Sequence, residues 1–130
     1  MRALLDTSVL IAVLEPKEAN PDLTGVTEVV ISSVSFSELY MGVATAGANS
    51  ALRKERESGI AKTKTAFGAG IPYDDMCALA FGVVSEQVLR SGGSPKSNIL
   101  DKMIAATAMA HGLVLVTRNA KDLRHLGQLV

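Results

Sequence analysis

The fold is indicated first by Ala3-Leu4-Leu5-Asp6-Thr7-Ser8, a short apolar run that ends in one carboxylate and two hydroxyls. Apolar residues then recur at helical spacing from Val9 to Leu14, and Pro16 closes the segment. The stretch therefore predicts a buried strand, a tight turn and a helix. Because Asp6 directly follows the strand, we expect it at the carboxyl end of a sheet, where α/β proteins hold their ligands.

The alternation of strands and helices continues along the chain. Val29-Val30-Ile31 predicts a second buried strand, and Ser35 opens a helix that runs towards Gly47. Further helices are expected over 50–67, 76–90 and 99–111, and further strands over 69–72 and 113–117. The expected helix caps are Asp74 or Asp75, Asn98 and Gly112. This order predicts an α/β fold, a three-layer α/β/α sandwich around a mostly parallel sheet.

The composition is that of one soluble globular domain, residues 1–130. Apolar residues make up 48% of the chain, and its thirteen basic and thirteen acidic residues cancel, which excludes binding of nucleic acid through bulk positive charge. The longest mostly apolar stretch, Met103 to Val116, is shorter than the ~18 residues that a membrane span needs, and no cleavage site follows Met1. The single cysteine, Cys77, is expected to be a buried thiol in a reducing cytoplasm.

Three carboxylates lie where a strand ends or a helix begins, namely Asp6, Glu38 and Asp101. Carboxylates that converge on one spot repel one another, so a fold that brings them together usually holds a divalent cation there. Oxygen-only ligation favours Mg²⁺ or Mn²⁺, and such ions chiefly serve phosphate chemistry. Asn119 or Asp122, after the last strand, either forms a turn or supplies a fourth oxygen.

Each of the three carboxylates also has a purely structural explanation. Asp6 is in position to cap the helix that follows it, and Ser35-Phe36-Ser37-Glu38 spells a capping box in which Glu38 reaches back to the backbone of Ser35. Asp101 lies in a first helical turn, where the helix dipole favours negative charge. It shares a helical face with Ala105 and Ala108, whose small side chains would let a neighbouring element approach closely.

Other polar residues are better explained by structure than by function. His111 and His125 have no histidine or cysteine at metal-binding spacing, which argues against a zinc site. Asp74-Asp75 is most simply a helix cap. The basic residues of the middle of the chain predict a solvated helix face rather than a nucleic-acid patch: Arg53, Lys54, Arg56, Lys62 and Lys64.

Taken together, four segments resemble the PIN-domain family, and within it the VapC-type toxins of bacterial toxin–antitoxin pairs. They are Leu5-Asp6-Thr7-Ser8, Ser35-Phe36-Ser37-Glu38-Leu39, Asp101-Lys102-Met103-Ile104-Ala105-Ala106-Thr107-Ala108 and Leu115-Val116-Thr117-Arg118-Asn119. The resemblance implies a Mg²⁺- or Mn²⁺-dependent endoribonuclease with Asp6, Glu38 and Asp101 as its core acidic residues. The family places its fourth acidic residue after Thr117, where this chain offers Asn119 and Asp122.

The resemblance also implies an RNA substrate, a cognate VapB-like antitoxin and a homodimer. Thr7, Ser8 and Thr117 are candidates for orienting ligands or water, and Arg118 for contacting a phosphate. A homodimer is further expected because the apolar residues of the first two helices exceed what one sheet face covers: Leu10, Val13, Leu14, Leu39, Tyr40 and Val43. Two alternatives remain, a receiver-like module that binds Mg²⁺ for regulation and a catalytically inactive PIN-like domain that binds a partner.

Overall fold

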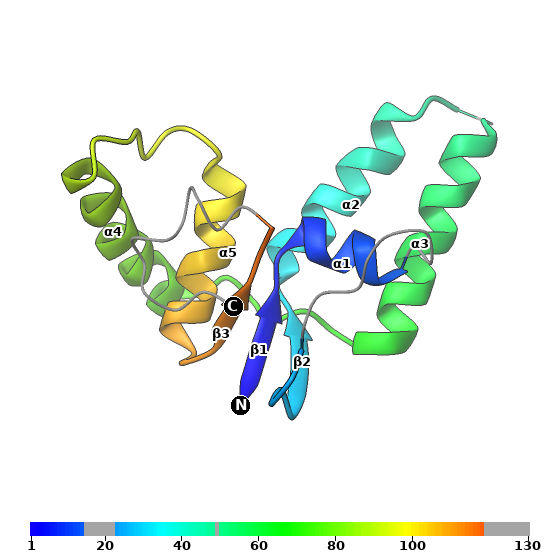
Figure 1. Ribbon diagram of the computed structural model, residues 1–130. Coiled ribbons are helices and arrows are strands. Elements are labelled where there is room, and N and C mark those ends of the chain that lie inside the picture. Colours follow the sequence, from blue (N-terminus) through cyan, green and yellow to red (C-terminus); the bar gives the residue numbers. More distant parts are fainter. Residues whose placement is uncertain (15–22, 49, 119–130) are drawn as a thin grey trace.

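A parallel three-stranded sheet forms the centre of the molecule in the computed structural model, which describes residues 1–14, 23–48 and 50–118 (Figure 1). The strands are β1 (Arg2–Leu5), β2 (Glu28–Ile31) and β3 (Val114–Val116), in the order β2-β1-β3. Leu5 of β1 lies opposite Ile31 on one side and Val116 on the other. The three strands therefore end at the same level, and the residues that follow them share one edge of the sheet.

Five helices cover the two faces of this sheet. They are α1 (Thr7–Leu14), α2 (Ser33–Thr45), α3 (Ala51–Phe67), α4 (Asp75–Arg90) and α5 (Ile99–Ala110). In Figure 1, α4 and α5 lie on one side of the sheet and α1, α2 and α3 on the other. The predicted three-layer α/β/α arrangement is thus confirmed. None of the helices in the described ranges has both the length and the apolarity needed to cross a bilayer.

The core lies on both faces of the sheet because successive strand residues point to opposite sides. Leu4 packs with Leu115 of β3 and with Ile104 of α5, whereas Leu5 packs with Leu10 of α1 on the other face. Leu4 and Leu5 are completely buried. Burial of each such side chain stabilises the fold by roughly 1.5–3 kcal/mol, and burial on both faces explains why the strands are continuous apolar runs.

Helix α5 lies between the sheet and α4, and its small residues make this possible. Ala105 and Ala108 pack into the cluster on the sheet face, while Ala106 packs against Ala80 and Val84 of α4. The close approach expected from the small side chains around Asp101 is therefore confirmed. A larger residue at 105 or 106 would push α5 away from a neighbour on one side or the other.

The start of α2 differs from the prediction. Ser32, not Ser35, is the N-cap, and its hydroxyl accepts a hydrogen bond from the Val34 N–H at 3.0 Å. Ser35 is already inside the helix, with its N–H bonded to the Ser32 carbonyl. The capping box between Ser35 and Glu38 was therefore wrong, which leaves the Glu38 carboxylate available for another role.

The strand expected over 69–72 is only a single bridge between Ile71 and Ser32. Pro72 follows directly and has no N–H to extend a ladder. Gly70 lies against the start of α2, where a Cβ would come within 2.7 Å of the Ser33 nitrogen. This bridge keeps Ser32 extended, so it determines where α2 begins.

The two ends of α5 also test the predicted caps. Asn98 precedes the helix in the left-handed conformation, with φ 51° and no side-chain capping bond, so its predicted capping role was wrong. The Gly112 prediction is confirmed. Gly112 has φ +63°, and the N–H of Leu113 reaches back to the Ala108 carbonyl at 2.8 Å, which closes the helix in a Schellman motif.

Candidate functional site

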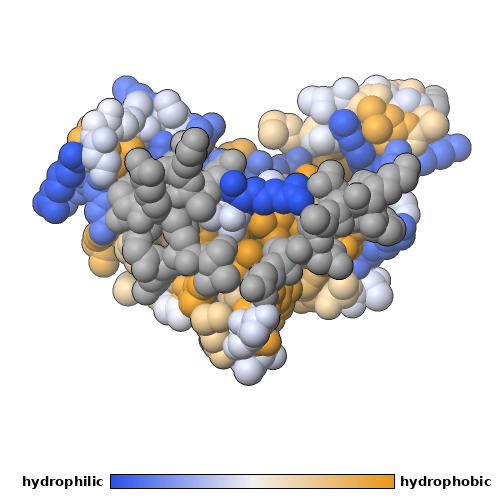
Figure 2. Space-filling model, in the orientation of Figure 1, coloured by the Kyte–Doolittle hydropathy of each residue, from blue (hydrophilic) through white to orange (hydrophobic). Residues whose placement is uncertain are grey.

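The predicted acidic residues gather at the edge where the strands end. Asp6 follows β1, Glu38 lies in α2, and Asp101 occupies the first turn of α5. Figure 1 shows the ends of the strands and the start of α5 at the same side of the molecule. In Figure 2 this side is hollowed between the part formed by α4 and α5 and the part formed by α2 and α3.

Asp6 is a buried capping residue whose carboxylate can accept more hydrogen bonds than the described donors supply. Its Oδ1 accepts from the Val9 N–H at 3.0 Å and from the Ser8 hydroxyl at 2.8 Å, and its Oδ2 accepts from the Thr117 hydroxyl. An ionised carboxylate has about four acceptor positions, and the described donors occupy three of them. Asp6 therefore caps α1 and, at the same time, keeps room for a cation.

Glu38 is held in place by α1 rather than by its own helix. The Thr7 hydroxyl donates to Oε1 of Glu38 at 2.6 Å, and it also hydrogen bonds with the hydroxyl of Ser35 at 3.0 Å. Thr7 directly follows Asp6, so one short segment fixes two of the carboxylates. The predicted orienting roles of Thr7, Ser8 and Thr117 correspond to these hydrogen bonds.

The charges of the three carboxylates act on one another. Burial raises the pKa of Glu38 above its ordinary value, the Thr7 hydrogen bond opposes this rise, and the negative charges of Asp101 and Asp6 raise the pKa further. Negative charges near a partly buried carboxylate repel it, and a bound cation would relieve this repulsion. Asp6 and Asp101 therefore each lie close enough to Glu38 for their charges to act on it.

The donor set fits a hard divalent cation. All three candidate ligands are carboxylates, the type that Mg²⁺ and Mn²⁺ prefer. Within the described ranges they do not form a trio with ligand atoms all within 4.8 Å of one another. Their oxygens would have to close on an ion or bind it partly through water, which is usual for Mg²⁺. Asn119 and Asp122 lie outside the described residues.

Two residues have positioning roles that the sequence did not indicate. Ser35 is completely buried and binds the hydroxyl that holds Glu38. Lys102 is also buried, and its ammonium donates to the Ser94 carbonyl at 2.8 Å and to the Ser97 carbonyl. It thereby fastens the loop before α5, next to Asp101. The only available signal for Lys102 was a single cation within an otherwise apolar helix.

The basic residues of α3 hold helices together instead of forming a separate binding patch. The Arg56 guanidinium donates to the Gly42 carbonyl of α2 at 2.6 Å, and the Lys64 ammonium donates to the Tyr40 hydroxyl at 2.8 Å. Arg53 pairs with Glu57 one turn along α3. The prediction of a solvated helix face is correct for the exposed side, and two of its cations also attach α3 to α2.

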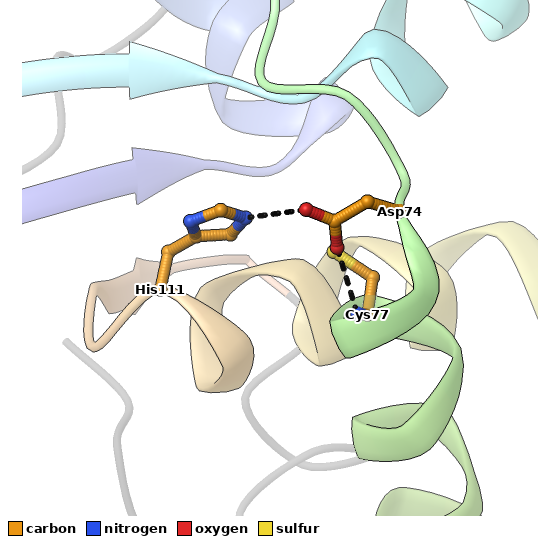
Figure 3. Close-up of side chains that lie close together, drawn as sticks. All are labelled: Asp74, Cys77 and His111. Carbon is orange, nitrogen blue, oxygen red and sulfur yellow. Dashed lines mark hydrogen bonds and ion pairs between the residues drawn. The ribbon is translucent and has the colours of Figure 1, made fainter.

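The structure places one histidine beside a cysteine that is distant from it in the sequence. Figure 3 shows His111, which follows α5, facing Asp74 and Cys77 at the start of α4. One ligand atom from each residue lies within 4.8 Å of the other two. The sequence separates His111 from Cys77 by more than thirty positions, so no short motif could reveal that packing of α4 on α5 joins them.

Comparisons with known proteins agree with the fold. The model of the PIN domain family matches residues 3–129. Ribonuclease VapC4 of Mycobacterium tuberculosis is 33% identical over 119 residues, which span 91% of this chain and 86% of that protein.

Solved structures share the fold over almost the whole chain. A VapBC-5 toxin–antitoxin structure from Mycobacterium tuberculosis has a TM-score of 0.76 at 25% identity, and the match covers 99% of this chain and 95% of that one. VapBC2 from Rickettsia felis, bound to a promoter DNA fragment, has a TM-score of 0.77 at 22% identity, covering 100% and 96%.

Proposed function

The chain belongs to the PIN-domain family, and from this premise we propose that it is an endoribonuclease that hydrolyses RNA phosphodiester bonds with Mg²⁺ or Mn²⁺. The observation that carries the proposal is that the negative charges of Asp6 and Asp101 act on Glu38 near the end of the sheet. The similarity to a protein named as a ribonuclease supports the choice of RNA as substrate.

In this proposal Asp6, Glu38 and Asp101 hold the metal. One or two bound ions would supply an activated water and stabilise charge on the phosphate during an in-line displacement. The chain's own hydroxyls keep the ligands in position: Thr7 fixes Glu38, while Ser8 and Thr117 fix Asp6. Arg118, exposed just beyond Thr117, is the proposed phosphate contact.

A fourth ligand is proposed from the segment after Arg118. Asp122 is favoured by charge, since a carboxylate binds a hard cation better than an amide, whereas Asn119 is favoured because it lies closer to the end of β3 in the sequence. We propose Asp122 for this position. If neither residue contributes, water completes a site of three carboxylates.

The receiver-like alternative is not favoured. Such a module needs a phosphate-accepting aspartate at the end of a central strand and a lysine after a later one. Here the central strand β1 is followed by Asp6, but β2 is followed by Ser32 and β3 by Thr117 rather than by a lysine. Only a measurement of RNA cleavage distinguishes the proposal from the alternative of an inactive PIN-like domain.

The purified chain, freed of any bound antitoxin, should cleave RNA in Mg²⁺ or Mn²⁺ and lose all cleavage in excess EDTA. The reason is that each proposed ligand is an oxygen donor, so no residue of the site substitutes for the ion. Gel analysis of a labelled RNA pool measures the cleavage, and readdition of Mg²⁺ after chelation controls for unfolding. Cleavage that survives the chelator would contradict the proposal.

We also propose a VapB-like antitoxin partner and a homodimer, acting in the cytoplasm. The antitoxin is supported by the toxin–antitoxin structures that share this fold. Exposed apolar side chains of α1, α2 and α3 offer it a surface: Ile11, Tyr40, Met41 and Leu52. Two of the residues that the sequence analysis expected on this surface, Leu10 and Val43, are instead buried in the core.

For the homodimer, α4 offers a second apolar surface. Met76, Leu79 and Val83 recur at helical spacing and are 59%, 67% and 44% exposed. We expect a dimer by light scattering at micromolar concentration, and a monomer for Leu79→Glu, because a buried unpaired charge is costly. Leu52→Glu on α3 is the control and should stay dimeric. A monomeric wild-type chain would rule the dimer out.

A further inference from the structure

The cluster of Asp74, Cys77 and His111 lies at the opposite end of α5 from the carboxylate site. Asp101 is in the first turn of α5 and His111 follows its last residue, so ten residues of helix separate them. At 1.5 Å per residue this is about 15 Å. The cluster is therefore separate from the proposed nuclease site, and the proposed ribonuclease reaction assigns it no role.

The geometry of the cluster divides the two oxygens of Asp74 between two roles. Oδ1 caps α4 by accepting from the Cys77 N–H at 3.0 Å, whereas Oδ2 lies 4.0 Å from Nε2 of His111 (Figure 3). In a tetrahedral zinc site with bonds of about 2.0–2.3 Å, neighbouring ligand atoms are roughly 3.3–3.7 Å apart. Ligand atoms that lie within 4.8 Å of one another need only small side-chain rotations to reach this spacing.

The surroundings suit a cation that binds sulfur and nitrogen. Cys77 is completely buried, and its thiol donates weakly to the Pro72 carbonyl at 3.7 Å and also interacts with the Asp74 carboxylate. A thiolate there would lie in the first turn of α4, where the helix dipole favours negative charge. The pKa of Asp74 is lowered, first by its hydrogen bond with the Cys77 N–H and then by the Cys77 thiol, with a smaller contribution from His111.

A surface ion pair between Asp74 and His111 is the simpler explanation, but it accounts for less. Their side chains are 49% and 34% exposed, and exposed pairs of this kind contribute between 0 and about 1 kcal/mol. Such a pair does not involve the buried sulfur, which completes the set of ligand types found in zinc sites.

We propose that Asp74, Cys77 and His111 bind one Zn²⁺ ion, with water as the fourth ligand, and that this ion ties the start of α4 to the end of α5. Thiolate and imidazole ligands select Zn²⁺ over Mg²⁺, which prefers oxygen. The partial exposure of Asp74 and His111 leaves a path for the ion and the water. Because α5 also carries Asp101, the ion would stabilise the helix on which the nuclease site depends.

Cobalt provides a specific test, because Cys77 is the only cysteine of the chain. Co²⁺ added to the full-length, chelator-treated protein should produce a thiolate-to-metal charge-transfer band that saturates at one equivalent, and Zn²⁺ should displace it. Zn²⁺ at a hundredfold excess over its Kd should raise Tm by about 5–10 °C, whereas Mg²⁺ should not alter the band. Absence of the band in the wild-type chain overturns the proposal.

Variants of the three residues separate the two metal sites. Cys77→Ser should abolish the band, and His111→Gln and Asp74→Asn should each weaken Co²⁺ binding at least tenfold. Asparagine still caps a helix, so Asp74→Asn keeps the fold even if Cys77→Ser does not. Asp75→Asn, next to the cluster, and Asp101→Asn, in the nuclease site, should both keep the band. Unchanged Co²⁺ affinity in His111→Gln also overturns the proposal, whatever the nuclease activity.

Discussion

Asp101→Asn should lower the rate of RNA cleavage by more than about 100-fold while leaving the fold intact. Loss of a residue that merely supports a metal ligand already costs about 10–100-fold in affinity or activity, so loss of a ligand itself should cost more. The structural cost is small, because the charge favoured at the start of α5 is worth only about 0.3–1 kcal/mol. Initial cleavage rates and thermal unfolding, measured on the same preparations, check both parts.

Asp6→Asn should behave in the same way, although Asp6 has a larger structural role. Asparagine caps helices as well as aspartate does, and its oxygen can still accept from the Val9 N–H. Asp75→Asn, an exposed carboxylate in the first turn of α4, is the matched control and should cleave like the wild type. A variant of Asp6 or Asp101 that unfolds instead would show that the carboxylate serves structure first.

The same assay decides the fourth ligand. Asp122→Asn should reduce cleavage and weaken Mg²⁺ binding in calorimetry if the carboxylate completes the site, and Asn119→Ala should do so if the amide oxygen does. If both variants cleave RNA and bind Mg²⁺ like the wild type, the site consists of three carboxylates completed by water.

The sequence was sufficient to predict the layers because short-range patterns of residues indicate most of the helices and strands. The buried strand before Asp6 and the glycine after α5 act through their immediate neighbours, and Gly112 adopts the left-handed conformation that a helix end requires. Asp6 was expected at the edge of the sheet because it directly follows a strand, and β1 does end at Leu5. These predictions needed periodicity and chirality but no knowledge of distant contacts.

Most of what the sequence did not reveal depends on contacts between distant segments. The sequence around the start of α2 offers three serines, Ser32, Ser33 and Ser35, and the bridge from Ile71 to Ser32 favours Ser32 as the cap. The capping box at Glu38 failed for the same reason, and the residue that Glu38 hydrogen bonds with instead, Thr7, lies 31 residues earlier. Likewise, His111 meets Cys77 only through the packing of α4 on α5. Local propensity carries no information about such pairs.

Glu38→Gln should abolish metal-dependent cleavage and, at neutral pH without metal, make the protein more stable. Glutamine keeps an oxygen for the Thr7 hydroxyl, so the hydrogen bond at 2.6 Å survives. It removes the charge that burial and the neighbouring Asp101 and Asp6 disfavour. Relief of such a functional-site conflict commonly raises stability by about 0.5–2 kcal/mol. Loss of activity with a gain of stability separates a metal ligand from a structural residue, whose loss would lower both.

The pH dependence of this gain follows from the sign of the pKa shift. The pKa of Glu38 is raised in the folded protein above its ordinary value of 4.5, so protonation of Glu38 stabilises the fold below that value. This contribution is lost as the pH rises through the raised, folded-state pKa. The advantage of Glu38→Gln over the wild type should therefore be largest at neutral pH and disappear below about pH 4.5.

Bound metal should make the wild type more stable than Glu38→Gln, the reverse of the order expected without metal. A cation bound by Asp6, Glu38 and Asp101 turns the repulsion on Glu38 into attraction, so saturating Mg²⁺ should raise the Tm of the wild type and leave that of Glu38→Gln almost unchanged. Glu86→Gln, an exposed change on α4, is the control and should respond to Mg²⁺ like the wild type. If Glu38→Gln gained as much from Mg²⁺ as the wild type does, Glu38 would not be a ligand, and its raised pKa would reflect burial beside a site formed by Asp6 and Asp101.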